Sequence, residues 1–542
     1  MSSKVAHYLQ QHLMGEVMTS ADALKYFSTD GSVFTKKPKI VVYPRNTSDV
    51  RKTARFTWQL AEKGHILPVT ARGKGTDQAG AAIGDGVVMV FPAHMNKILE
   101  LDKNTVTVQP GAIFSKVEQT LHTHGRFLPP YPSSSEFSTI GGAVANNAAG
   151  EKTIKYGQMR EYTQGLQVVL ANGELIKTER IGKREVNKRK GKDTFEGYIY
   201  RELEGLIIEN QAIIDRAKLN VSKNSAGYAL GEVRKKDGSM DLTPLLVGSQ
   251  GTLGVVTQAT VKTEPYNPAT TLLAGFFESI TDAQKAVAGL LETKPSALEM
   301  VDANLLEFVK KHHPEQLRGI VGEPFPQIVL LCEYDDLNER TQKRKSKKAK
   351  KILIESAVEI RLTTDEHEKE TLWKIRHSAA AVIWQVVGTA KALPIIEDGV
   401  VPRTKLEEYM MRTYEIFDKY KLDAALWGHA GDANLHMQPF LDLGKVSDRQ
   451  QVFKIMEEYY SMVLELGGST SGEHNDGRLR APFLPRVYGD NMYGVFKAVK
   501  KLFDPHGTLN PGVKIDVELK DLVPLLRKEY SLEHLYDNMP RS

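Results

Sequence analysis

The chain has 542 residues, of which 41% are hydrophobic and 26% are charged, an ordinary globular composition that at about 150 residues per domain predicts three or four domains. The formal net charge of +5 is too small for this length to indicate nucleic-acid binding, and a single cysteine, Cys332, excludes an intramolecular disulfide. Because no apolar signal segment and no stretch of ~18 apolar residues occurs, we expect a cytoplasmic protein, with peripheral contact at the inner membrane as the alternative.

The first part of the sequence alternates helix and strand patterns. Residues 4–27 predict an amphipathic helix from apolar residues at helical spacing. Residues 38–44 predict a strand between two prolines, and residues 48–63 predict a helix that ends before a glycine. A further strand at 66–70 leads into a glycine loop at 72–76. Strand, helix, strand and glycine loop together predict the start of a nucleotide-binding unit.

The glycine loop has the sequence Arg72-Gly73-Lys74-Gly75-Thr76. Its glycines let backbone N–H groups approach an anion closely, and Arg72 or Lys74 would add positive charge. Neither the dinucleotide fingerprint nor the Walker pattern occurs here, which argues against a standard NAD or ATP site. Taken alone, the loop is equally compatible with a plain turn. A second glycine-rich stretch, residues 141–150, has few side chains larger than valine and predicts backbone packed against a flat or extended group.

Two runs of basic residues carry the positive excess. Residues 183–192 predict a solvated loop insertion, and residues 340–351 predict an exposed helix or loop. We interpret both as solvated surface, with a docking site for anionic lipid or an acidic partner as the alternative. Between them, Cys332 lies in an apolar strand-like run, which predicts a core residue.

The stretch Trp427-Gly-His-Ala-Gly-Asp-Ala-Asn-Leu-His-Met-Gln438 carries two histidines around turn-forming residues. It predicts a strand, a tight loop and a second strand that bring His429 and His436 across from one another. Alternation along the second strand would place Asn434, His436 and Gln438 on one face. Two imidazoles and a carboxamide indicate a metal or proton-transfer site, and the alternative is a pair of satisfied core histidines.

Four motifs occur in order along the chain. They are Arg-Gly-x-Gly-Thr at 72–76, a Pro- and Ser-rich segment leading to Thr-Ile-Gly-Gly at 132–147, Gly-Ser-x-Gly-Thr-Leu-Gly at 248–254, and Phe-Asp-Pro-His-Gly-Thr-Leu-Asn-Pro-Gly at 503–512. As a set they resemble the FAD-linked oxidases of the vanillyl-alcohol oxidase type, in particular the branch that contains D-lactate and D-2-hydroxyglutarate dehydrogenases. The likeness covers roughly residues 38–514.

The resemblance implies an α+β fold with four parts. Residues 1–36 would be an N-terminal helical segment, and residues 37–265 a two-subdomain FAD-binding domain of the PCMH type. Residues 266–500 would form a cap domain, an antiparallel sheet with flanking helices. Residues 501–542 would return to the FAD domain.

The resemblance also implies that FAD is bound without a covalent link, because Thr76 stands where members with attached flavin usually carry a histidine. The residues implied to hold FAD come from the four motifs and, in the case of Val256, from just after the third. They are Arg72, Gly73, Lys74, Gly75, Thr76, Pro132, Thr139, Gly142 and Asn146 around the pyrophosphate, Gly251 and Val256 on the adenine and ribityl side, and Asn510 near the isoalloxazine.

Relatives also carry a Gly-His-x-Gly-Asp-x-Asn-Leu-His motif and, further along, Glu-His in a glycine loop; both occur here. The implied ligands of a divalent metal, zinc or manganese, are His429, His436 and Glu473. Two histidines and one carboxylate leave coordination positions open, as a catalytic site requires. His474 is the implied general base.

The segment Trp373-Lys-Ile-Arg376 resembles the family segment whose arginine binds the substrate carboxylate, and Asn434 would orient the substrate or a ligand. Together these residues imply oxidation of a D-2-hydroxy acid, such as D-lactate, to the 2-oxo acid, with hydride transfer to flavin N5. The electron acceptor would be a quinone, a cytochrome or an electron-transfer flavoprotein. The alternatives are a non-redox ether-lipid (alkylglycerone-phosphate) synthase of the same fold, a metal-dependent hydrolase and a flavin-binding electron-transfer subunit.

Overall fold

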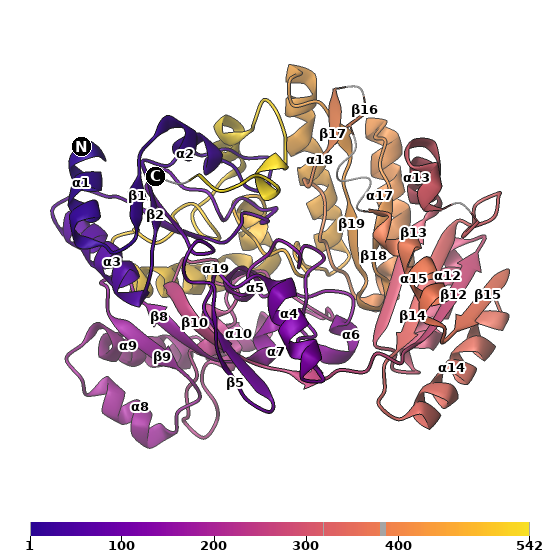
Figure 1. Ribbon diagram of the computed structural model, residues 1–542, viewed down its shortest axis with the longest axis horizontal. Helices are drawn as coiled ribbons and strands as arrows, with labels where there is room; N and C mark the ends of the chain where they lie inside the picture. Colours follow the sequence, from indigo (N-terminus) through magenta and orange to yellow (C-terminus); the bar gives the residue numbers. More distant parts are fainter. Residues whose placement is uncertain (1, 318, 380–385, 388, 541–542) are drawn as a thin grey trace.

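The computed structural model describes residues 2–317, 319–379, 386–387 and 389–540 (Figure 1). In Figure 1 the indigo-to-magenta N-terminal part and the yellow C-terminal part lie together as one lobe, and the pink-to-orange middle of the chain forms the other. Among the described residues, no helix is long and apolar enough to cross a membrane. The boundaries at residues 36, 265 and 500 stay a prediction.

The first sheet has the strand order β1-β2-β4-β3, with β1 antiparallel to β2 and the other pairs parallel. Its strands are β1 (Glu16–Met18), β2 (Ile40–Tyr43), β4 (Val87–Val90) and β3 (Val69–Arg72). Helix α3 (Thr47–Glu62) follows β2 and is capped by the Asn46 side chain, so the predicted strand and helix are confirmed. The glycine loop leaves the sheet at the carboxyl end of β3.

The predicted helix over residues 4–27 is wrong. The segment forms α1 (Ser2–His12) and α2 (Ala21–Tyr26), with β1 between them. The Asp49 carboxylate accepts hydrogen bonds from the backbone N–H groups of Met14 and Gly15, which ends α1. A Cβ on Gly15 would lie 1.9 Å from the carbonyl oxygen of Tyr43, so only glycine allows the chain to reach β2 here. Pairing with a strand further along the chain overrides the local helical pattern.

The second sheet is antiparallel and has the order β5-β6-β10-β8-β9. Its strands are β5 (Ile98–Leu101), β6 (Thr105–Val108), β10 (Val255–Lys262), β8 (Thr163–Val169) and β9 (Leu175–Thr178). Buried and half-buried residues alternate along β10, so one face of it packs on the core. That core also takes in α5 (Ile140–Asn146), α9 (Phe195–Glu209) and α19 (Leu484–Phe503), so the end of the chain helps to build this lobe.

Residues 183–190 form a helix, α8 (Lys183–Lys190), so the predicted loop is wrong, whereas its residues other than Val186 are exposed or half-buried as predicted. Its Val186 side chain is buried in the core of this lobe. The run is dominated by basic residues, and Val186 is the only one of its residues that packs in the core.

The third sheet has the order β15-β12-β14-β13-β18-β19. Its strands are β15 (Glu359–Thr363), β12 (Thr271–Phe277), β14 (Ile328–Tyr334), β13 (Ala297–Asp302), β18 (Leu426–His429) and β19 (Asn434–Met437). Helices α12 (Ile280–Leu291) and α14 (Glu339–Ile354) contribute to the core on one face, and α13 (Ala303–His312) and α15 (Glu366–His377) to the core on the other. Because both faces are covered, β12, β13 and β14 are buried along their whole length, and Cys332 of β14 is the predicted core residue.

Candidate active site

The two site histidines lie on the hairpin β18–β19 at the end of the third sheet, which confirms the predicted strand, tight loop and strand. His429 pairs with Asn434 and Trp427 with His436 in the register. The two histidines are therefore diagonal neighbours on one face, and their ring centroids lie 5.2 Å apart with the planes at 89°. The hairpin turns at Ala433, whose φ is +52°.

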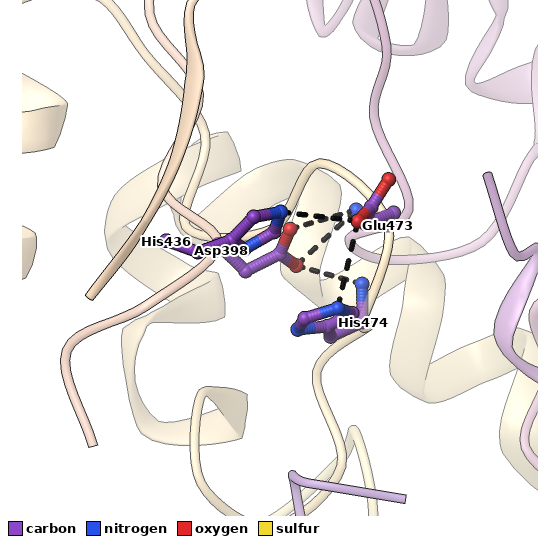
Figure 2. Close-up of side chains that lie close together, drawn as sticks. All are labelled: Asp398, His436, Glu473 and His474. Atoms are coloured by element: carbon purple, nitrogen blue, oxygen red, sulfur yellow. Dashed lines mark hydrogen bonds and ion pairs between the residues drawn. The ribbon is translucent and has the colours of Figure 1, made fainter. Parts of the chain in front are cut away.

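The imidazoles of three histidines converge on one carboxylate oxygen, Oε1 of Glu473. The distances to this oxygen from Nε2 are 3.1 Å for His429, 3.2 Å for His436 and 3.5 Å for His474. Figure 2 shows dashed contacts from both His436 and His474 to Glu473. The rings of His429 and His436 are buried, whereas the His474 side chain is 25% exposed. The first two histidines are thus enclosed, and the third reaches solvent.

A carboxylate lies beside the Nδ1 atom of each ring. His429 Nδ1 is 2.7 Å from Glu299 Oε1, and His436 Nδ1 is 3.4 Å from Glu397 Oε2. His474 Nδ1 is 2.5 Å from the same Glu397 oxygen. Carboxylates in these positions fix the ring orientation and make Nε2 the better electron donor. All three Nε2 atoms are therefore presented to the same point.

The pKa values of the site residues are shifted because acids and imidazoles lie close together. Burial lowers the pKa of His429, but the Glu299 carboxylate outweighs it, and the pKa is raised to about 9. Burial likewise lowers the pKa of His474, and Glu397 together with Asp398 raises it to about 9. Burial raises the pKa of Glu473, yet the cations and imidazoles around it hold the pKa far below its ordinary value. Glu473 is therefore an anion that attracts positive charge.

Asp398 also lies beside this cluster, with an oxygen within 4.8 Å of donor atoms on the neighbouring side chains (Figure 2). Its oxygens already accept hydrogen bonds from Ser471 Oγ at 2.6 Å, the His474 N–H at 2.7 Å, the Glu473 N–H at 3.0 Å and Asn434 Nδ2 at 3.2 Å. These donors occupy its lone pairs. Asp398 therefore shapes the loop that carries Glu473 and His474, and we do not count it as a metal ligand.

The donor set His429, His436 and Glu473 fits a divalent metal of the zinc or manganese type. It offers two imidazole nitrogens that each lie close to one carboxylate oxygen, with the rings oriented by further carboxylates. Three protein ligands leave room for substrate oxygens. The metal itself stays a prediction.

Lys223 is a site residue that no local sequence pattern indicates. Its ammonium lies 2.6 Å from Glu473 Oε2, and its side chain is fully buried. Lys223 thus occupies one carboxylate oxygen and leaves Oε1 facing the three imidazoles. We interpret it as the residue that sets the orientation of Glu473.

Replacing Lys223 with methionine should weaken zinc or manganese binding by about 10- to 100-fold, because a ligand that loses its orienting partner binds metal less well. The measurement is metal affinity by chelator competition, with FAD content followed in parallel. Lys514→Met is the matched control: Lys514 is equally buried and pairs with Asp476 at 2.6 Å, but it does not contact Glu473. Unchanged affinity in Lys223→Met would contradict the positioning role.

A cleft between the glycine loops ends at the histidine cluster. Nine of the residues implied to hold FAD line it, and so do Glu473 and His474. The nine are Gly73, Lys74, Gly75, Thr76, Pro132, Thr139, Gly142, Asn146 and Gly251. The implied cofactor site and the implied metal site therefore share one cavity.

The cleft wall is built from backbone that only glycine permits. Gly75 has a φ of +82°, and a Cβ on it would lie 2.2 Å from Arg72 Nη2. A Cβ on Gly73 would lie 2.6 Å from Thr139 Oγ1. These two loops therefore pack closely and expose main chain to the cleft, a surface that fits the pyrophosphate and the flat rings of FAD.

Three of the residues implied to hold FAD do not line the cleft. Arg72 is buried behind the glycine loop, where Nη1 donates to the carbonyl oxygens of Thr29 at 2.8 Å and Ala82 at 3.2 Å. Asn510 Nδ2 donates to backbone carbonyl oxygens behind the same loop. Val256 packs on the core of the second sheet. In this geometry Arg72 and Asn510 support the cleft wall.

The C-terminal segment closes over the glycine loop. His534 Nε2 donates to the carbonyl oxygen of Gly75 at 3.0 Å. Burial and the nearby Arg72 guanidinium lower the pKa of His534 to about 3. His534 is therefore neutral in the folded protein at neutral pH.

Stability should fall on acidification because of His534. The unfolded chain takes up this proton near pH 6.5 and the folded chain only near pH 3, so the stabilisation is complete above pH 6.5 and is lost as the pH falls below it. Between pH 7 and pH 5 the loss is about 2 kcal/mol. The variant His534→Gln keeps a donor for Gly75 but has no proton to take up. In urea unfolding, its free energy of unfolding should therefore fall between pH 7 and pH 5 by about 2 kcal/mol less than that of the parent. Equal losses in the two proteins would contradict this assignment.

Arg376 of α15 is joined to the cluster through one carboxylate. Its Nε donates to Glu299 Oε2 at 2.8 Å, and the other oxygen of Glu299 faces His429. Its terminal nitrogens donate to no residue in the described part of the chain. Arg376 does not line the cleft itself. It therefore has N–H groups available near the cluster.

Asn434 is buried at the start of β19. Its Nδ2 donates to Asp398 and to the carbonyl oxygen of Gly399, at 3.2 and 3.0 Å. Its Oδ1 is buried and accepts no hydrogen bond from the residues that the structure describes. An orphaned buried oxygen of this kind is a docking point for a donor group.

Sequence reasoning missed Glu299 and assigned no chemistry to Glu397, the two acids that orient the histidines. Each had a signal. Glu299 is a charged residue inside the apolar strand Ala297–Asp302, and Glu397 follows the apolar run Leu393-Pro-Ile-Ile396. A charged residue in such a run is buried and must have a partner.

Comparisons with known proteins agree with this geometry. Residues 38–179 match the family described as FAD binding domain, and residues 267–513 match FAD linked oxidases, C-terminal domain. The chain is 32% identical to glycolate oxidase subunit GlcD of Bacillus subtilis (strain 168), over 91% of the chain and 92% of that relative. It is 27% identical to a D-lactate dehydrogenase of Archaeoglobus fulgidus, over 92% of the chain and 96% of that relative. It is 29% identical to D-2-hydroxyglutarate dehydrogenase of Escherichia coli (strain K12), over 93% of the chain but 50% of that longer protein.

Solved structures show the same fold. 4-Ethylphenol oxidase from Gulosibacter chungangensis superposes with a TM-score of 0.68 at 15% identity, over 96% of this chain and 98% of that one. p-Cresol methylhydroxylase superposes with a TM-score of 0.66 at 15% identity, over 96% of this chain and 97% of that one. The chain belongs to the FAD-linked oxidases, with the predicted α+β, PCMH-type fold. Within them it is an FAD-dependent oxidoreductase of the branch of D-lactate dehydrogenase, D-2-hydroxyglutarate dehydrogenase and GlcD.

Proposed function

We propose that the protein oxidises a D-2-hydroxy acid, with D-lactate as the simplest candidate, to the 2-oxo acid, and that a divalent metal assists. One observation carries this proposal: the cleft lined by residues implied to hold FAD ends at His474 and Glu473, where the three imidazoles converge. When bound, FAD supplies the acceptor for the hydrogen and electron pair of the substrate Cα–H bond, and the divalent cation supplies a Lewis acid for the hydroxyl oxygen.

His474 is the residue we assign to the hydroxyl proton. It alone of the three histidines lines the cleft, and its Nε2 points toward Glu473 while Nδ1 faces Glu397. A proton taken up on Nε2 gives an imidazolium that Glu397 stabilises. A divalent cation held by the neighbouring ligands would lower the pKa of His474 from about 9, because like charges repel, and would leave the ring free to accept the proton.

Arg376 and Asn434 are the residues we assign to substrate positioning. The terminal N–H groups of Arg376 can bind the two oxygens of a carboxylate, and its Nε stays on Glu299. The free Oδ1 of Asn434 would accept a hydrogen bond from the substrate or from a metal-bound ligand. Held in this way, a 2-hydroxy acid has its hydroxyl group directed to the cluster.

The test is anaerobic reduction of the FAD-loaded protein by a panel of D- and L-2-hydroxy acids, followed by stopped-flow loss of the flavin absorbance. We expect rapid bleaching by at least one D-isomer and slow or no bleaching by its L-isomer. Removal of the metal with a chelator should slow the reaction, and its return should restore the rate. If no 2-hydroxy acid bleaches the flavin, the proposed reaction is wrong.

A further inference from the structure

Helix α14 presents a stripe of cations on its outer face. Its inner face packs on the third sheet through buried residues at helical spacing, namely Gln342, Ser346, Ala349 and Leu353. On the opposite side, four exposed basic residues recur at i, i+4, i+7 and i+11 and so form a single stripe. These four, the α14 stripe, are Arg340, Arg344, Lys347 and Lys351.

The α14 stripe is not neutralised by acidic neighbours. Other lysines of the helix do pair, such as Lys343 with Glu339 at 2.5 Å and Lys345 with Asp336 at 2.9 Å. None of the four stripe residues has an ion pair within the described ranges of the chain. In the other basic run, by contrast, four residues lie 2.6 to 3.8 Å from glutamates; they are Lys188, Arg189, Lys190 and Lys192. The two basic runs thus differ in structure although their composition is similar.

Exposed aliphatic side chains flank the α14 stripe. Leu337, before the helix, is 67% exposed. Ile354 continues the stripe at its end with 63% exposure, and Val358 just beyond has 60%. In Figure 1, α14 lies at the outer end of its lobe, beside the edge strand β15. Cations flanked by aliphatic side chains on a protruding helix are typical of a surface that meets both headgroups and acyl chains.

We propose that the outer face of α14 docks this protein on a bilayer that contains anionic lipid. Each stripe residue gains about fivefold in affinity near an anionic surface, so the four act together. The aliphatic residues favour a bilayer over an acidic protein or a nucleic acid, because those partners give them no acyl region to enter. Docking of this kind is peripheral. It does not depend on the reaction proposed above.

The test is flotation of the FAD-loaded full chain with vesicles of phosphatidylcholine alone or mixed with phosphatidylglycerol. We expect at least tenfold tighter binding to the anionic vesicles, weakened by salt. The variant R340Q/R344Q/K347Q/K351Q should bind the anionic vesicles at least tenfold more weakly than the parent. The matched control K183Q/R184Q/K188Q/K192Q removes four charges from the other basic run and should bind within twofold of the parent. No preference for anionic vesicles, or an equal loss in the control, would overturn the proposal.

A second variant separates a bilayer from other anionic partners. Leu337→Ser, Ile354→Ser and Val358→Ser together keep every charge and lie on exposed positions, so the fold is retained. We expect this variant to bind the anionic vesicles more weakly than the parent and to bind heparin as the parent does. Binding to heparin or to nucleic acid without binding to vesicles would assign the α14 stripe to a soluble polyanion and overturn the bilayer assignment.

Discussion

Replacing His474 with alanine should slow flavin reduction by a D-2-hydroxy acid by about 10²- to 10⁴-fold, the usual loss when a general base is removed. The reason is that His474 is the imidazole on the cleft wall, whereas His429 and His436 are enclosed. FAD content and metal content should stay at the parental level. The measurement is anaerobic stopped-flow reduction, with both contents determined on the same sample.

Two controls make this result specific. Added imidazole should restore part of the rate in His474→Ala, because the space left by the ring lies at the open cleft and can admit it. His367→Ala, an exposed histidine of α15, should reduce its flavin like the parent. Reduction of His474→Ala at the parental rate would contradict the role as base. Loss of metal together with activity would make His474 a metal ligand instead.

Replacing Arg376 with lysine should lower kcat/KM for the hydroxy acid by about 10- to 100-fold, since a hydrogen bond to a charged group is worth about 1.5–3 kcal/mol. Lysine keeps a charge for Glu299 but cannot offer two parallel N–H groups to a carboxylate. The effect should therefore fall mainly on KM. The same loss should appear in the Kd of the 2-oxo acid product, measured by the change in flavin absorbance on binding.

The neighbouring variant Lys374→Met serves as the control, because Lys374 lies on the same helix but is exposed. It should leave KM and the product Kd unchanged. Arg376→Met is expected to do more than Arg376→Lys, because it leaves the buried Glu299 without its cation and so disturbs His429. An unchanged KM in Arg376→Lys would mean that Arg376 acts only through Glu299.

The parts of the site that depend on local sequence could be predicted. The hairpin of His429 and His436 follows from turn-forming residues between two apolar runs, and the glycine loop follows a strand because both signals are contiguous. The resemblance then supplied the link between Glu473 and the hairpin. The structure places these residues together.

The rest depends on pairings between distant segments. Glu299 reaches His429 because β13 lies next to β18, where Met300 pairs with Gly428. Nothing in the sequence around Glu299 indicates that neighbour. The same limit explains the wrong helix over residues 4–27, where pairing of β1 with β2 decides the structure. Lys223 lies in a loop with no local pattern, so only the folded structure reveals its contact with Glu473.

The most direct test of the shared site is anomalous diffraction at the zinc edge from crystals of the protein loaded with FAD and zinc. We predict one strong peak in contact with Nε2 of His429, Nε2 of His436 and Oε1 of Glu473, with the isoalloxazine in the same cleft beside His474. A peak remote from these three atoms, or a flavin bound outside that cleft, would contradict the account.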